Sequence, residues 1–180
     1  MGTRTRFAQL ISLLMCITLL AARGEDAAAL EGKPAPQVNL TTLDGKSFRL
    51  GDLRGSVVVL DFWATWCGPC RESLPHLQKL SADKDRFKKG LRVLAVNAGE
   101  QQPVVKKFVD ENRLTMPIPM DPGRSARTAY RVTALPTTVV IGKDGVVKKV
   151  MVGYGPQTSE ELDTAIDAAL DEQAPKRSPR

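Results

Sequence analysis

The stretch Asp61-Phe62-Trp63-Ala64-Thr65-Trp66-Cys67-Gly68-Pro69-Cys70 decides the fold and the chemistry of this chain of 180 residues. It continues an apolar run that begins at Val57, and a run of that length predicts a strand covered on both faces. The two cysteines then lie three positions apart at the start of a helical period. Unpaired amides and the helix dipole at such a helix end favour a thiolate on the first sulfur. We therefore expect thiol–disulfide exchange, with Cys67 as the attacking nucleophile and Cys70 as the more shielded resolving thiol.

Other chemistries of paired cysteines fit the sequence less well. A zinc site usually has four ligands, and beyond the first 22 residues the chain offers Cys67, Cys70 and His76. Covalent haem attachment requires a histidine directly after the second cysteine, where this chain has Arg71. A purely structural disulfide would close so short a loop that it adds little stability through chain entropy. We therefore expect a redox-active disulfide, with no metal and no cofactor.

The first 24 residues are expected to be a signal peptide or a membrane anchor rather than part of the fold. Arg4 and Arg6 precede an almost unbroken apolar run at 7–22. Its length lies between that of a signal-peptide core and the roughly 17 to 25 residues that span a bilayer, so removal and retention both stay open. Either alternative places the domain in the periplasm or another extracytoplasmic compartment, tethered to the inner membrane by residues 7–22 if they are retained.

Composition and charge indicate one ordinary domain. Hydrophobic residues make up 42% of the chain and charged residues 26%, which excludes a wholly disordered or collagen-like chain. The 26 Lys plus Arg and 20 Asp plus Glu give a net charge of +6, but no basic run alternates with aromatic residues, so nucleic-acid binding is not expected. We expect a linker at 25–36, a monomeric domain at 37–172 and a disordered basic tail at 173–180.

Apolar periods along the domain alternate between strand-like and helix-like. Strands are expected at 57–62, 91–96, 137–141 and 146–152, and a hairpin at 38–40 and 47–50 across the turn residues Asp44-Gly45. Helices are expected at 70–87, 104–109, 125–130 and 159–170, with Thr158 or Ser159 capping the last. This order predicts an α/β fold in which helices flank both faces of a central mixed β-sheet, with the β-hairpin as an N-terminal extension.

Several motifs resemble those of a known family. Trp66-Cys67-Gly68-Pro69-Cys70 matches the thioredoxin active-site pentapeptide. The wider pattern resembles the exported TlpA-like and ResA-like branch of the thioredoxin superfamily. Its features here are Asp44-Gly45-Lys46, Leu53-Arg54-Gly55, Leu60-Asp61-Phe62-Trp63-Ala64, Pro75, Val96-Asn97 and Leu135-Pro136-Thr137-Thr138. The resemblance covers residues 34–170 and implies a thioredoxin-like fold and a protein-disulfide oxidoreductase.

The resemblance also implies how a partner protein is bound. Pro136 matches the family's cis-proline, which lies against the disulfide. Leu135, directly before it, would offer backbone hydrogen bonds to an extended substrate, and such main-chain pairing accepts varied sequences. Trp66, together with Gly68 and Pro69, would form the surface that meets the partner. These four positions are therefore expected to bind substrate beside the two cysteines.

Asp61 matches the buried aspartate of thioredoxin, six residues before Cys67, where many TlpA-like proteins carry asparagine. If Asp61 is buried, its pKa should rise, and it would then be suited to relay the proton of Cys70 during the resolving step. The alternative is an ordinary acid that is solvated at the end of its strand.

Other polar residues near the motif are expected to lie outside the chemistry. The TlpA-like branch often has a glutamate three residues after the second cysteine, but here that position is Ser73. Glu72 is one helical position away and should point to solvent. Glu100 is expected to be an acid in a surface loop, with an approach to the active site from the strand that ends near Asn97 as the alternative. His76 is expected to be solvated on its helix.

The resemblance and the Gly68-Pro69 dipeptide favour a reductant over an oxidant. The dipeptide resembles that of thioredoxin, with a potential of about −270 mV, more than the strongly oxidising DsbA at about −120 mV. Expected partners are exported proteins with disulfides, such as apocytochrome c in cytochrome c maturation, and a membrane electron donor. Two other classes stay open: a peroxiredoxin-like peroxidase, which shares the hairpin and the Leu53-Arg54-Gly55 segment, and a non-enzymatic module that binds copper or thiol proteins.

Overall fold

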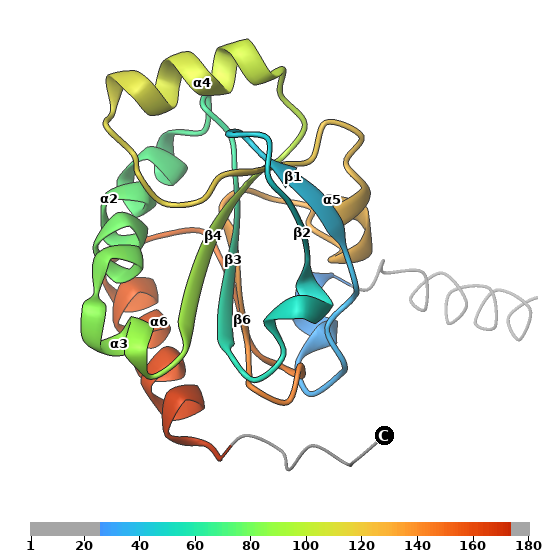
Figure 1. Ribbon diagram of the computed structural model, residues 1–180, viewed down its shortest axis with the longest axis vertical. Coiled ribbons are helices and arrows are strands. Elements are labelled where there is room, and N and C mark those ends of the chain that lie inside the picture. The colour runs from blue at the N-terminus through green and yellow to red at the C-terminus, as the bar shows by residue number, and fades with distance from the viewer. Residues whose placement is uncertain (1–25, 174–180) are drawn as a thin grey trace, which may run out of the picture.

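The apolar run before the cysteines forms strand β3 (Val57–Trp63), in which every residue is buried. In the computed structural model, which describes residues 26–173, β3 lies between a parallel partner, β4 (Leu91–Asn97), and an antiparallel partner, β6 (Thr137–Ile141) (Figure 1). Residues of β3 contribute to core clusters on both faces of the sheet. This is the two-sided burial that a continuous apolar run predicts.

The sheet formed by the described residues has seven strands in the order β2-β1-β5-β4-β3-β6-β7. The remaining strands are β1 (Asn39–Thr42), β2 (Ser47–Arg49), β5 (Pro119–Met120) and β7 (Val147–Val152). β1 and β2 form the expected hairpin, which joins the other strands through β5. The sequence did not predict β5, because a strand of two residues is too short to show an apolar period.

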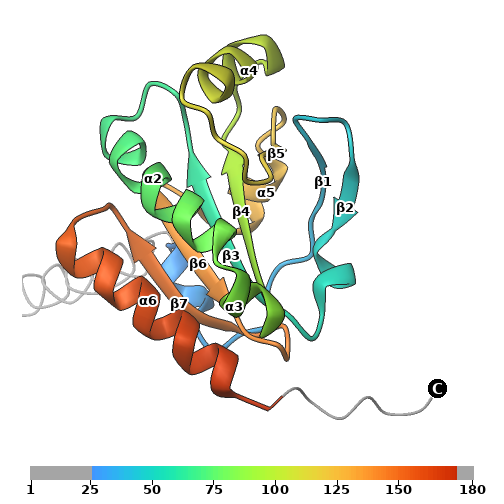
Figure 2. The same ribbon diagram turned by 60° about the vertical axis from the view of Figure 1, so that its left-hand side comes forward.

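Helices cover both faces of this sheet. They are η1 (Ala27–Leu30), η2 (Leu50–Leu53), α2 (Gly68–Ala82), α3 (Lys84–Lys88), α4 (Gln102–Glu111), α5 (Ser125–Ala129) and α6 (Pro156–Asp171). α2, α4 and α6 contribute to one core cluster, and Figure 2 shows α2 and α6 side by side on that face. η1 and α5 contribute to a second cluster on the opposite face. The expected α/β architecture with an N-terminal hairpin is confirmed.

Residues 27–35 pack onto the sheet and so differ from the linker expected at 25–36. Val147 of β7 exchanges backbone hydrogen bonds of 2.8 and 2.9 Å with this segment. The amide of Val150 donates to the Glu31 carboxylate at 2.7 Å. The segment therefore satisfies polar groups along the outer edge of β7. Its buried residues are the small Ala27 and Ala35 and the larger Leu30, which anchors the segment in the core.

The single helix expected at 70–87 is divided into α2 and α3. Asp83 lies between them with an extended backbone and is the N-cap of α3. Its carboxylate accepts hydrogen bonds from the amides of Asp85 and Arg86, each at 3.0 Å. Aspartate is a favoured N-cap because it pairs with amides that have no partner within the helix. The break between the two helices is therefore caused by the cap at Asp83, which the spacing of apolar residues does not reveal.

The last helix, α6, begins earlier than expected. Its first residue is Pro156, a position where proline is favoured because the missing amide would be unpaired in any case. Gly155 is the N-cap and makes no side-chain capping bond. Thr158 and Ser159 lie inside the helix instead, and the Ser159 hydroxyl donates to the Pro156 carbonyl at 2.9 Å. The expected hydroxyl cap is therefore wrong.

The ends of the chain lie outside the described part. The expected signal peptide or anchor at 1–24 falls there, as does the expected tail from residue 174 onward. Within residues 26–173, no helix has the length and apolar character needed to cross a membrane.

Candidate active site

The two cysteines lie where β3 ends and α2 begins. They form a disulfide with an S–S distance of 2.02 Å. Cys67 is the N-cap of α2, and its sulfur accepts a hydrogen bond from the backbone amide of Cys70 at 3.2 Å. Cys67 is 5% exposed and Cys70 is fully buried. In the reduced protein the same amide and the helix dipole favour negative charge on the sulfur of Cys67.

The loop before β6 lies beside the cysteines. The Leu135–Pro136 peptide bond is cis. Thr137, the next residue, pairs with Phe62 near the end of β3, where the cysteine loop starts. Leu135 packs against the core cluster that contains both cysteines. The amide of Gly153, after β7, donates to the Pro136 carbonyl at 2.8 Å, so a third loop joins the site.

Asp61 is fully buried in the centre of β3, so it is not the solvated strand-end acid of the alternative interpretation. Burial raises its pKa to about 7, against a smaller lowering by a hydrogen bond from Thr138. The Thr138 hydroxyl donates to Oδ1 of Asp61 at 2.6 Å. Asp61 therefore exchanges a proton near neutral pH on the side of the sheet that faces α2.

The two tryptophans of the motif lie in opposite environments. Trp66 is 67% exposed, and Gly68 and Pro69 next to it are also exposed. Trp63 is fully buried, and its ring nitrogen donates to the Ala95 carbonyl at 3.0 Å. The cysteine loop thus presents a large apolar side chain to solvent, while Trp63 anchors the end of β3 in the core.

Glu100 holds the cysteine loop, so the expectation of an acid in a surface loop is wrong. Its Oε2 accepts from the amide of Thr65 at 2.7 Å, and its Oε1 accepts from the Thr65 hydroxyl at 2.6 Å. The Asn97 side chain donates to the same carboxylate at 2.8 Å. Glu100 follows β4, and the carboxyl ends of the parallel strands β3 and β4 meet at one edge of the sheet. That adjacency was the clue available in the sequence.

Arg71 holds the same loop from the other side. Its Nε donates to the Thr65 carbonyl at 2.8 Å. The guanidinium lies over the ring of Phe108, 5.5 Å from its centroid, and Phe108 in turn packs against Trp63. Thr65 is thereby bound at its amide, hydroxyl and carbonyl, two residues before Cys67. These contacts fix the backbone that presents the first sulfur.

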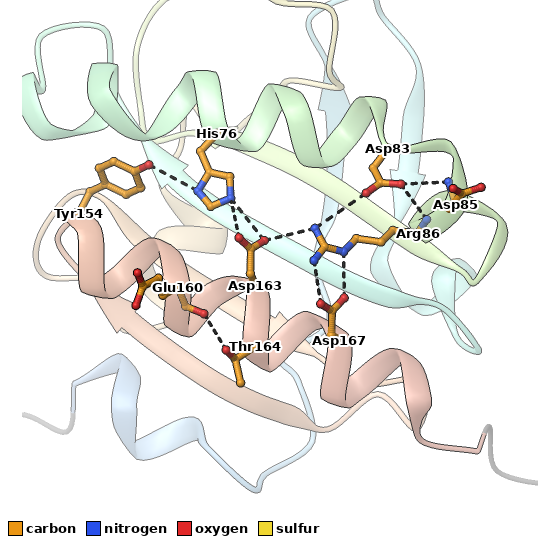
Figure 3. Close-up of polar contacts among 9 residues, drawn as sticks. All are labelled: His76, Asp83, Asp85, Arg86, Tyr154, Glu160, Asp163, Thr164 and Asp167. Atoms are coloured by element: carbon orange, nitrogen blue, oxygen red, sulfur yellow. Dashed lines mark hydrogen bonds and ion pairs between the residues drawn. The ribbon is translucent and has the colours of Figure 1, made fainter.

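His76 connects two helices, so the expectation of a solvated helix position is wrong. Its side chain is 19% exposed. Nε2 lies 3.4 Å from Asp163 of α6, and Nδ1 lies 3.4 Å from the hydroxyl of Tyr154 (Figure 3). Glu72 is exposed as expected, while Ser73 is buried and donates to the Cys70 carbonyl at 2.9 Å. Within the described part of the chain, no three His, Cys, Asp or Glu side chains gather to hold a metal ion.

Comparison with known proteins gives consistent relatives. A family model described as Redoxin matches residues 30–166. The chain is 37% identical over 164 residues to the thiol-disulfide oxidoreductase ResA of Geobacillus thermodenitrificans, covering 86% of this chain and 92% of the relative. It is 37% identical over 167 residues to ResA of Bacillus cereus, covering 89% and 93%. A Chlorobium tepidum structure, assigned as the thiol:disulfide interchange protein DsbE, is 36% identical with a TM-score of 0.72, covering 78% of this chain and 97% of that chain.

Proposed function

We propose that this chain reduces disulfides of exported proteins. It belongs to the Redoxin family and is a ResA-like thiol-disulfide oxidoreductase with a thioredoxin-like fold. Its activity is thus that of a thiol-disulfide oxidoreductase, rather than that of the peroxidase or of the copper- or thiol-binding module that the sequence left open. The observation that carries the exchange reaction is the position of Cys67. Its sulfur caps α2 and accepts the Cys70 amide, which favours the thiolate that attacks a partner's disulfide. The reducing direction rests on the Gly68-Pro69 dipeptide, which resembles that of thioredoxin.

The reaction proceeds through a mixed disulfide. The Cys67 thiolate attacks one sulfur of the partner's disulfide, a bond forms between them, and the partner's other sulfur leaves as a thiolate. Cys70 then loses its proton and attacks the Cys67 sulfur, which releases the second partner sulfur. Two electrons pass to the partner, and the enzyme is left with the Cys67–Cys70 disulfide.

Asp61 accepts the proton of Cys70 in the second step. Burial raises its pKa to about 7, so near neutral pH it is ionised in part of the molecules and able to take up a proton. It lies on β3 with its side chain on the α2 face of the sheet, where Cys70 is also buried. A carboxylate in this position supplies the base that a fully buried thiol otherwise lacks.

The partner binds as an extended segment across the site. The backbone of Leu135, before the cis bond to Pro136, offers main-chain hydrogen bonds to the partner. The exposed ring of Trp66 supplies an apolar surface next to Gly68 and Pro69. Main-chain pairing together with an apolar surface suits substrates of varied sequence.

The compartment is proposed from the N-terminal sequence, and the partners from the similarity to ResA proteins. The apolar run at 7–22 directs the domain to the periplasm or an equivalent extracytoplasmic space, either as a cleaved signal or as an inner-membrane anchor. A reductant there needs a membrane protein that returns two electrons to the Cys67–Cys70 disulfide after each cycle. Oxidised apocytochrome c during cytochrome c maturation is the proposed substrate.

Trapping of the mixed disulfide tests this function. In Cys70→Ala the first step is intact and the second is removed, so partners should remain bound to Cys67 and be released by dithiothreitol. Cys67→Ala is the matched control, and it should trap no partner and reduce no insulin. Recovery of an apocytochrome c in the trap would support the maturation role. Equal insulin reduction by Cys67→Ala and the unchanged protein would refute the reductase.

A further inference from the structure

The two carboxylate oxygens of Asp61 have different surroundings. Oδ1 accepts the hydrogen bond from the Thr138 hydroxyl at 2.6 Å. Oδ2 is the single buried side-chain oxygen or nitrogen of residues 26–173 that has no hydrogen-bond partner in this part of the chain. Buried polar atoms are nearly always paired, so an unpaired one requires an explanation. Asp61 leaves the sheet on the face against which Cys70 packs, which suggests that the explanation is chemical.

The sheet register brings Thr138 to Asp61. The two residues lie directly opposite each other on the antiparallel strands β3 and β6. Side chains alternate along a strand, and Trp63 and Val140, two residues further along each strand, belong to the cluster that contains Cys70. Both side chains therefore leave the same face of the sheet. Thr138 is 5% exposed, so its hydroxyl donates to Asp61 in a region of low dielectric constant.

We propose that Thr138 is a positioning residue for the resolving step: its hydroxyl occupies Oδ1 of Asp61 and thereby leaves Oδ2 as the atom that takes the proton of Cys70. The inference rests on the proposed function, in which Asp61 is the base. In this step the S–H bond of Cys70 breaks and an O–H bond forms at Oδ2. The Cys70 thiolate then attacks the Cys67 sulfur while the partner's thiolate leaves. Protonation at Oδ1 would instead require the threonine hydroxyl to turn away its hydrogen and become an acceptor.

Thr138 also opposes the effect of burial on Asp61. Burial is the larger cause and raises the pKa of Asp61, whereas the Thr138 bond stabilises the ionised form and lowers the pKa. Tyr154 is close enough for the charge of Asp61 to act on it, but its own pKa is raised, chiefly by burial. Its hydroxyl is therefore neutral at pH 7. The titratable groups that face this region are Cys70, Glu72 and His76 on α2, Tyr154 before α6 and Asp163 on α6. Thr138 is therefore the neighbour that keeps the carboxylate available near neutrality.

Replacement of the hydroxyl tests the inference. Thr138→Val keeps the shape and the strand propensity but removes the donor. The titration of Asp61, followed by carbon-13 NMR of labelled aspartate, should shift upward by about one pH unit, the effect of one hydrogen bond to a charged group. The pH profile for release of a preformed mixed disulfide should shift by the same amount, a loss of about tenfold on its rising limb. Thr138→Ser, which keeps the donor, should restore both.

Two further variants separate the outcomes. Thr137→Val removes a buried hydroxyl that donates to the Ala134 carbonyl, so it should leave the Asp61 titration unchanged. Thr138→Ala provides a second variant without the hydroxyl if the valine variant does not fold. An unchanged titration and release profile in the Thr138 variants would overturn the inference, even if Cys70→Ala still traps partners and the reductase stands. Failure of the trap itself would instead refute the proposed function.

Discussion

Two regions of the molecule use carboxylates in opposite ways. The pair of Asp61 and Thr138 is buried, and its carboxylate has one hydrogen bond. Between α2, α3 and α6 lies a second region, the helix cluster, which is partly exposed and rich in ion pairs (Figure 3). We define the helix cluster as His76, Asp83, Arg86, Asp163 and Asp167. The cluster contains more charges, yet Asp61 is the carboxylate that is suited to proton transfer.

The two regions differ in their exposure to solvent and in whether a cation neutralises the carboxylates, rather than in the number of contacts. Arg86 donates to both carboxylate oxygens of Asp167, at 2.9 and 2.8 Å, and also contacts Asp163 at 3.3 Å. These hydrogen bonds and charges raise the pKa of Arg86, and they hold its charge in place. Asp61 has no cation beside it, and burial moves its pKa to about 7. Burial without a neighbouring cation, and not the number of contacts, raises the pKa of this carboxylate.

The largest difference between the two regions should appear in how the free energy of unfolding changes with pH. The pKa of Asp61 rises from 3.8 to about 7 on folding, so the folded protein keeps a proton that the unfolded chain has released. The contribution of this proton to the free energy of unfolding is complete below about pH 4. It is lost as the pH rises to about 7, which lowers the free energy of unfolding by roughly 4 kcal/mol. Denaturant unfolding of the oxidised protein should show this fall, and Asp61→Asn should abolish it.

Asp163→Asn is the control from the helix cluster for that measurement. Asp83, in the same cluster, has a lowered pKa because it accepts hydrogen bonds from backbone amides. Its contribution therefore has the opposite sign and is lost as the pH falls. Asp83 is present in both variants, so its contribution cancels when their pH profiles are compared. The same pH slope in Asp61→Asn and Asp163→Asn would contradict the comparison.

Glu100 is an intermediate case, since it is half-buried but accepts three hydrogen bonds from side chains and backbone. Glu100→Gln keeps one acceptor oxygen and places an NH2 donor against the Thr65 groups. We expect it to reduce the free energy of unfolding by about 1 to 2 kcal/mol, and to slow insulin reduction several-fold because the loop before Cys67 loosens. Glu72→Gln on the exposed side of α2 is the matched control. Equal stability and rates in the two variants would refute the role of Glu100.

A smaller effect is expected when the helix cluster loses its central cation. Arg86→Met keeps much of the apolar stem but removes the bonds to Asp163 and Asp167. Partly exposed ion pairs contribute about 0 to 1 kcal/mol each, so the free energy of unfolding should fall by about 1 kcal/mol in dilute buffer and by less in 1 M salt. Insulin reduction should stay unchanged. Lys106→Met, which removes an exposed pair with Asp110, provides the reference for a single surface contact.

The smallest effect is expected for His76. Its contacts with Tyr154 and Asp163 are long, at 3.4 Å each, and they lie on the helix cluster side of α2. His76→Ala should therefore leave the rate of insulin reduction within about twofold of the unchanged protein, because the substitution touches neither sulfur. A loss comparable to that of Cys67→Ala would place the histidine in the chemistry and remove the distinction between the two regions.

Local patterns in the sequence were sufficient for much of the fold. The run at 57–62, the turn at Asp44-Gly45 and the strand at 137–141 all appear as expected. Each depends on the alternation or continuity of apolar residues within one segment. The break at Asp83 and the two-residue β5 escaped that reasoning, because a cap and a very short strand leave the apolar period unchanged.

What the sequence determined by itself is the reactive pair: the spacing of Cys67 and Cys70 after a buried strand places both at a helix end, and that geometry is local. Only the tertiary structure decided how the pair is supported. Thr138 is 77 positions from Asp61, and Glu100 is 35 positions from Thr65, so neither contact can be found in a local period. Both arise because β3 is flanked by β4 and β6 in a fixed register, which turns distant positions into neighbours.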